Sequence, residues 1–199
     1  MTVHKIKLRD LDEKFIQDLR DKLGDEDIEL EIRISAGHGD CAGKEMNEDL
    51  FWKTIEKFDW EKEGDDKAVM EPAIRFLSQC SIKNIKAFHN ILSEKLYSLD
   101  GERYARQTGS NVYSENGPFS VDVFLYARCC VVANGKEYYE HVLQDPTEMP
   151  KGLTFESILN LPAYAFELKT GLEFVHVPSK NYETFFNAEG WNEPTPRII

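Results

Sequence analysis

Alternation of apolar and polar residues marks three short segments of the chain. Residues 3–8 and 28–34 alternate near the N-terminus, and residues 172–177 alternate again much later. Such alternation is typical of a strand with one buried face. Between the first two segments, apolar residues at helical spacing predict a helix over residues 11–23, which Gly24 ends. Residues 1–36 are therefore predicted to form a β-α-β unit.

Two strands and one helix bury too little apolar surface to be stable by themselves. The rest of the chain, a second copy or a partner must complete the unit. We expect residues 172–177 to join the two N-terminal strands. The predicted fold class is therefore α+β: a mainly helical domain with a small N-terminal β-α-β unit, completed by a C-terminal strand at residues 172–177.

Helical periodicity dominates the middle of the chain. Apolar residues recur at intervals of three and four in five segments, which are 47–58, 67–79, 82–99, 136–144 and 155–169. Pro162 predicts a kink in the last of these helices. The predicted domains are a glycine-rich linker at residues 37–46, a helical domain at 47–171, and a strand with a docking tail at 172–199. Phe185, Phe186 and Trp191 suggest that this tail packs against the protein.

Residues 121–139 are apolar on both faces of any helix drawn through them, which predicts a central, buried helix. The run is too short to span a bilayer. Arg128 carries the one charge between Asp122 and Lys136. A buried guanidinium needs a compensating partner, so the sequence predicts a specific internal one. Asp100 and Glu140 are the candidates.

The net charge of the chain is −12, and the acidic excess extends over the whole sequence. No segment is basic, so binding to nucleic acid is not expected. No run is long and apolar enough for a membrane span, and no membrane association is expected. Uniform acidity indicates solubility or a basic protein partner. The four cysteines lack CxxC spacing, which favours reduced thiols and a cytoplasmic location.

Four residues are candidates for binding a ligand: Arg128, Asp122, His89 and Asp100. Arg128 forms either a structural ion pair or an anion pocket. His89 lies inside the apolar stripe of its helix, where it is either a hydrogen-bonded core residue or a catalytic one. No catalytic triad order, phosphate-binding glycine loop or zinc-binding HExxH motif is present. No cofactor and no metal are expected.

Several short motifs identify a family resemblance over residues 50–170. They are Phe51-Trp52-Lys53-Thr54-Ile55, Phe58-Asp59-Trp60, Leu96-Tyr97-Ser98-Leu99-Asp100, Phe124-Leu125-Tyr126-Ala127-Arg128-Cys129 after Asp122, and Asn134-Gly135-Lys136-Glu137-Tyr138-Tyr139. Together they resemble the family known as domain of unknown function 4240. The resemblance implies a mainly helical domain and no established activity.

Two functional hypotheses follow. The first is a non-catalytic protein-binding or regulatory module, immunity- or antitoxin-like, that binds a basic partner or self-associates through the N-terminal β unit. The acidity and the lack of a catalytic constellation favour it. The second is a small enzyme or anionic-ligand binder with a pocket around Arg128, Asp122 and His89. The sequence leans towards the first and leaves enzymatic activity undecided.

Overall fold

The computed structural model describes residues 44–115 and 117–192, together with Lys14, Gln17, Asp18, Asp21 and Cys41. Contacts divide the chain into two units, Met1–Ala36 and Gly37–Ile199. In the first unit the four described residues are helical, in agreement with a helix near residues 11–23. The predicted strands at 3–8 and 28–34 lie outside the described residues.

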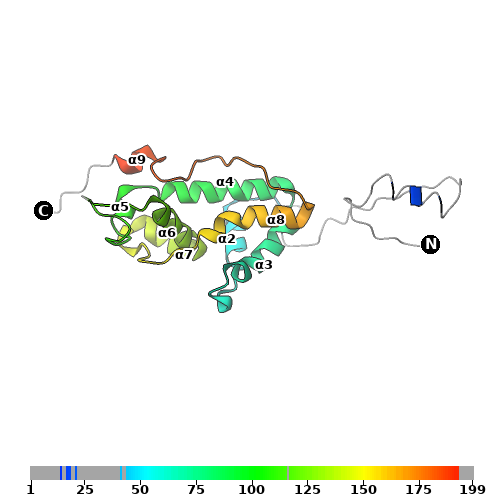
Figure 1. Cartoon of the computed structure of the whole chain (residues 1–199), viewed down its shortest axis with the longest axis horizontal. Helices are drawn as coiled ribbons and strands as arrows, with labels where there is room; N and C mark the ends of the chain where they lie inside the picture. Colours follow the sequence, from blue (N-terminus) through cyan, green and yellow to red (C-terminus); the bar gives the residue numbers. More distant parts are fainter. Residues whose placement is uncertain are drawn as a thin grey trace. The chain divides into compact units, whose positions relative to one another are not determined.

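The second unit is built from helices, with long connections between α5 and α6 and between α8 and α9 (Figure 1). In chain order they are α2 (Glu48–Ile55), η2 (Trp60–Lys62), α3 (Asp66–Gln79), α4 (Ile82–Ser98), α5 (Glu102–Ala105), α6 (Val121–Ala133), α7 (Lys136–Gln144), η3 (Pro146–Glu148), η4 (Glu156–Asn160), α8 (Leu161–Thr170) and α9 (Ala188–Trp191), where η denotes a 3-10 helix.

Polar side chains start the first three long helices. Asn47 accepts a hydrogen bond from the Leu50 amide at the start of α2, and Asp65 accepts one from Ala68 at the start of α3. Ser81 caps α4 in the same way. Each cap satisfies an amide that has no partner within the helix. The short local sequence therefore explains where these helices begin.

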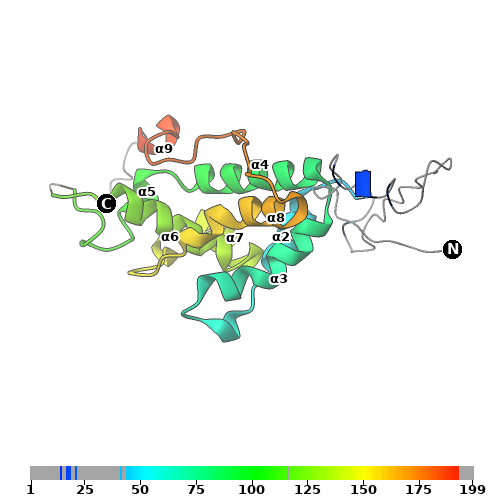
Figure 2. The same ribbon diagram turned by 45° about the vertical axis from the view of Figure 1, so that its right-hand side comes forward.

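α6 lies at the centre of the unit, as its apolar sequence predicts. It packs against α4, α7 and η4, while α8 packs against α3 and α4. Nearly all of its residues from Phe124 to Ala133 are buried. The long helix α4 lies along one side of this group, with the chain that follows α8 running beside it (Figures 1 and 2).

The prediction of an α+β fold is wrong. The described part of the chain contains helices and one isolated bridge, between Tyr113 and Phe119, but no paired strand. Residues 172–177 form an irregular segment whose alternation is nevertheless real: Phe174 and His176 are half-buried, whereas Val175 and Val177 are exposed. Phe174 packs against His89 of α4 and Phe166 of α8. Helix surfaces therefore cover alternate side chains of this segment, as a sheet would.

The predicted helix over residues 155–169 is two elements. η4 ends at Asn160 and α8 begins at Leu161, with Pro162 in the first turn of α8. A proline is well tolerated there because its missing N–H would have no partner within the helix. Pro162 therefore starts a helix and does not kink one.

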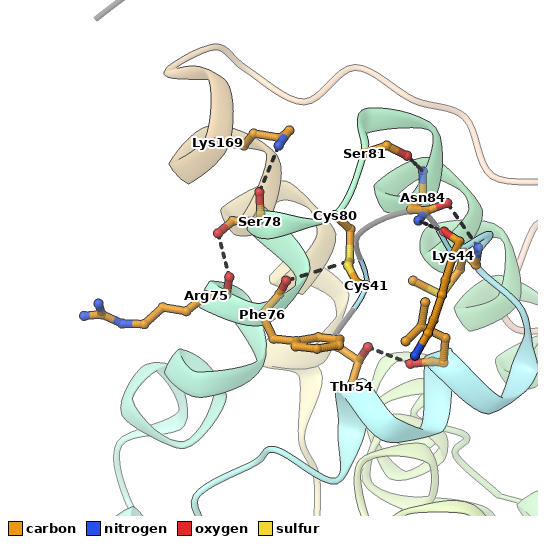
Figure 3. The surroundings of a disulfide bond; sticks show 12 residues. Cys41, Lys44, Thr54, Arg75, Phe76, Ser78, Cys80, Ser81, Asn84 and Lys169 are labelled. Carbon is orange, nitrogen blue, oxygen red and sulfur yellow. Dashed lines mark hydrogen bonds between the residues drawn. A yellow bond between two sulfur atoms is a disulfide. The ribbon is translucent and has the colours of Figure 1, made fainter. Parts of the chain in front are cut away.

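A disulfide joins Cys41 to Cys80, with 5.4 Å between the two Cα atoms (Figure 3). The prediction of reduced thiols is wrong for this pair, because sequence spacing does not reveal which distant cysteines meet. Cys129 and Cys130 are free and buried. The buried Asn84 also fixes the chain after Cys41, because its side chain donates to the Lys44 carbonyl (2.8 Å) and accepts from the Met46 amide (3.1 Å).

We expect the Cys41–Cys80 disulfide to stabilise the second unit. It closes a loop of 39 residues, for which the chain-entropy model gives about 3–4 kcal/mol. Urea unfolding of the Cys80→Ser variant should show a loss of this size. A reductant should destabilise the parent chain but leave a Cys41→Ser, Cys80→Ser double variant unchanged. Equal sensitivity of both proteins to reductant would contradict the expectation.

Candidate functional site

Arg128 on α6 is completely buried and has hydrogen-bond partners from two other parts of the chain. Its Nη1 donates to the carbonyls of Leu96 and Tyr182, both at 3.0 Å, and its Nη2 donates to Thr184 Oγ1 at 3.0 Å. Nε has no partner among the described residues. The guanidinium thus joins α6 to the end of α4 and to the segment that precedes α9.

Asp100 is the carboxylate closest to Arg128, with 3.9 Å between Oδ1 and Nη1. It is also completely buried. Its oxygens accept hydrogen bonds from the amides of Phe185 (3.2 Å) and Asn187 (2.9 Å) and from Trp191 Nε1 (2.9 Å). Three donors of the C-terminal segment therefore compensate this carboxylate in addition to Arg128.

The predicted choice between two carboxylates is thereby resolved. Asp100 forms the ion pair with Arg128. Glu140 is exposed on α7, where its Oε1 lies 3.8 Å from Lys136 Nζ. Burial lowers the pKa of Arg128, and the nearby Asp100 acts in the opposite direction. An arginine remains charged in proteins, so this pair is a buried ion pair held by hydrogen bonds.

The backbones of α5 and α9 approach closely beside Asp100. A Cβ atom added to Gly190 would lie 2.5 Å from the Asp100 carbonyl oxygen, and one added to Gly101 would lie 2.9 Å from the Gly190 carbonyl oxygen. Phe185 has a φ of 79°, a left-handed conformation that side chains disfavour. Its amide donates to Asp100, so this hydrogen bond helps to hold the turn.

His89 on α4 forms a separate contact, with His176. Their Nδ1 atoms are 3.1 Å apart, so one ring donates and the other accepts. Phe174 packs against both rings, at 5.6 Å and 5.7 Å between ring centres. Burial lowers the pKa of His89 to about 4, and the neighbouring His176 adds to this effect. Burial also lowers the pKa of His176, and Lys86 adds to it.

The four predicted site residues are thus not gathered in one place. Arg128 and Asp100 form one cluster, and His89 contacts His176 in another. Asp122 is exposed in the first turn of α6, where a carboxylate favours the helix dipole. Reasoning from sequence missed Thr184 and His176, although the alternation over residues 172–177 places His176 on the same side as Phe174.

The connection between α2 and α3 forms an acidic loop, defined here as residues 59–66. Trp60, near the start of the loop, is 42% exposed, and its ring packs on Phe155 (5.2 Å between ring centres) and Phe58 (5.8 Å). The loop also carries five carboxylates, which are Asp59, Glu61, Glu63, Asp65 and Asp66.

Several contacts hold the acidic loop in position. The Asp59 amide donates to the Val69 carbonyl (2.9 Å), and Asp66 accepts from Ser157 Oγ (2.7 Å). Glu61 and Glu63 are exposed and have no ion-pair partner within the described ranges. An aromatic ring and free carboxylates are therefore presented on an ordered support.

Within residues 44–115 and 117–192, no cluster of three metal-ligating side chains is present. No helix of the described part is long and apolar enough to cross a membrane. Burial raises the pKa of Cys129, so its thiol is protonated at neutral pH. The described residues thus offer a buried ion pair, a histidine pair and charged surface features.

These features define a small helical domain whose C-terminal segment is held by a buried ion pair. The chain belongs to the family described as Protein of unknown function (DUF4240), whose model matches residues 46–168. The resemblance predicted from the sequence motifs is confirmed. A search of the curated proteins found no match, and a search of the solved structures found none either.

We expect Arg128→Ala to lower the free energy of unfolding by about 3–5 kcal/mol, because it leaves a buried carboxylate without its cation. Urea denaturation measures this loss. Arg75→Ala is the matched control, since Arg75 is exposed and pairs with Glu71 on the same helix; its cost should stay below about 1 kcal/mol. Equal costs for the two variants would contradict a structural role of Arg128.

We also expect acid to destabilise the contact between His89 and His176. The folded pKa of His89 lies below its ordinary value of 6.5, so the unfolded chain binds protons first as the pH falls. The stability that neutral His89 contributes is present above about pH 6.5 and is lost towards pH 4. The full shift corresponds to about 3 kcal/mol, which solvent screening of the partly accessible ring reduces to about 1–2 kcal/mol.

Unfolding measured across this pH range tests the expectation. His89→Gln should flatten the dependence, while the exposed His141→Gln should retain it. The same pH dependence in both variants would show that the titrating group lies elsewhere.

Proposed function

We propose that this chain is a non-catalytic protein-binding module with a regulatory role, immunity- or antitoxin-like, that engages a basic partner. The observation that carries the proposal is the acidic loop, which presents Trp60 between carboxylates on a fixed support. Exposed aromatic side chains are frequent anchors of protein interfaces. The net charge of −12 favours encounter with a basic surface.

The buried position of Arg128 supports a structural role at the predicted site over ligand binding or catalysis there. The guanidinium is completely buried, and Leu96, Tyr182 and Thr184 accept its hydrogen bonds. A ligand would have to displace these contacts in order to reach it. The alternative of an enzyme or anionic-ligand binder centred on Arg128, Asp122 and His89 therefore has less support. A cytoplasmic location stays a prediction.

The partner surface is proposed to combine an apolar pocket for Trp60 with basic side chains around it. Trp60 supplies apolar contact area to the interface, and Glu61 and Glu63 supply negative charge. Their contributions to the binding kinetics can therefore be measured separately. Removing an aromatic anchor raises the dissociation rate, whereas removing exposed charges mainly slows association and reduces its salt dependence.

The test starts with affinity capture by the full chain and by a Trp60→Ala variant. We expect the parent chain to capture a basic protein in stoichiometric amount. The Trp60→Ala variant should capture little of that protein. For the purified pair, Trp60→Ala should weaken binding by about 2 kcal/mol or more, roughly thirtyfold. Glu61→Gln with Glu63→Gln should reduce the salt dependence of association.

Leu172→Ala is the matched control, because Leu172 is a 65% exposed apolar residue outside the acidic loop. It should leave affinity unchanged. The proposal fails if no basic protein is recovered, or if the captured protein binds the Trp60→Ala variant as tightly as the parent chain.

A further inference from the structure

A surface pocket of about 470 Å³ lies between α2, α3 and the chain that precedes α2. Its lining residues are Lys44, Leu50, Lys53, Glu56, Lys57 and Phe76. The volume is within the range of small-molecule sites. Leu50, Lys53 and Lys57 share one face of the sequence around α2, at spacings of three and four residues.

The charge of this pocket is opposite to that of the chain. Three lysines face one carboxylate, Glu56, in a protein whose net charge is −12. Within the part of the chain that the structure describes, none of these lysines is within ion-pair distance of a carboxylate. Four lysines outside the pocket are paired, namely Lys62, Lys83, Lys95 and Lys136. The lining therefore carries an excess of positive charge, which Glu56 offsets only in part.

Contacts within the protein hold the Lys57 side chain and the Lys44 backbone near the pocket. Lys57 Nζ lies 4.5 Å from the centre of the Phe76 ring, and Phe76 is itself buried. The Lys44 carbonyl accepts from Asn84, and the preceding Cys41 is bonded to Cys80 (Figure 3). A preorganised site loses less entropy when a ligand binds.

We propose that this pocket binds a small phosphate-bearing anion with at least two negative charges. Lysine ammonium groups act as point charges that bind phosphate oxygens. Three of them around one cavity favour a polyvalent anion over a monovalent one. Leu50 and Phe76 give the pocket an apolar part of its wall, which suits the organic portion of a phosphate ester. The site is independent of the acidic loop and of the buried Arg128.

The test is calorimetric titration of the full chain with inorganic pyrophosphate at constant ionic strength and neutral pH. We expect saturable binding of one pyrophosphate per chain. Lys53→Gln and Lys57→Gln should each weaken the affinity about fivefold, which is the effect of losing one charge contact in a solvated site. The double variant should weaken the affinity about 25-fold, because it loses two such contacts. Raising the salt concentration should weaken binding by the parent chain more than by the double variant.

Two controls keep the outcome interpretable. Lys151→Gln removes an exposed lysine outside the pocket and should leave the affinity unchanged. Lys53→Arg and Lys57→Arg keep the charge and should retain affinity within about twofold, given the similar Coulomb energy. No saturable binding, or equal affinity in the Lys53→Gln, Lys57→Gln double variant, would overturn the proposal. Neither result bears on Trp60, so this proposal and the proposed function fail independently.

Discussion

The Arg128 guanidinium is removed from water and therefore has to be compensated inside the protein. Its partners are the carbonyls of Leu96 and Tyr182, the hydroxyl of Thr184 and the nearby Asp100 carboxylate. They come from α4, from the turn between α4 and α5, and from a segment more than fifty residues further along the chain than Arg128. The cation is satisfied only when α4, α6 and this segment are in place together. One buried charge thus couples the helical core to the docking of the C-terminal segment.

Charge has a different role on the surface, where water screens it. The helix pair α2 and α3 carries two contrasting features: the acidic loop with Trp60, and the lysine-lined pocket beside Phe76. Their supports differ as well. Aromatic packing on Phe155 holds the loop, whereas the Cys41–Cys80 disulfide and Asn84 hold the chain beside the pocket. The protein therefore presents opposite charges on a common rigid base, separate from the buried ion pair.

Much of the helical domain could be predicted because its signals are local. Asn47 caps α2 as its position before an apolar run suggests, and the stripe from Ile82 to Leu99 corresponds to α4. The motif around Arg128 identified the family, and its apolar surroundings indicated burial. The prediction of a strand at 172–177 was wrong for a physical reason. Alternation indicates that one side of the segment is covered, but not whether a helix or a strand covers it. The Cys41–Cys80 bond was missed because it depends on which distant segments meet.

The sequence by itself determined the starts of α2, α3 and α4, the central buried helix and the need for an internal partner of Arg128, since periodicity, capping and desolvation act through neighbouring residues. The tertiary structure alone decided that Asp100 and the C-terminal segment compensate Arg128. It also separated His89 and Asp122 from that cluster and brought lysines from two segments to one pocket. These outcomes depend on packing between residues far apart in the chain, which no local pattern records.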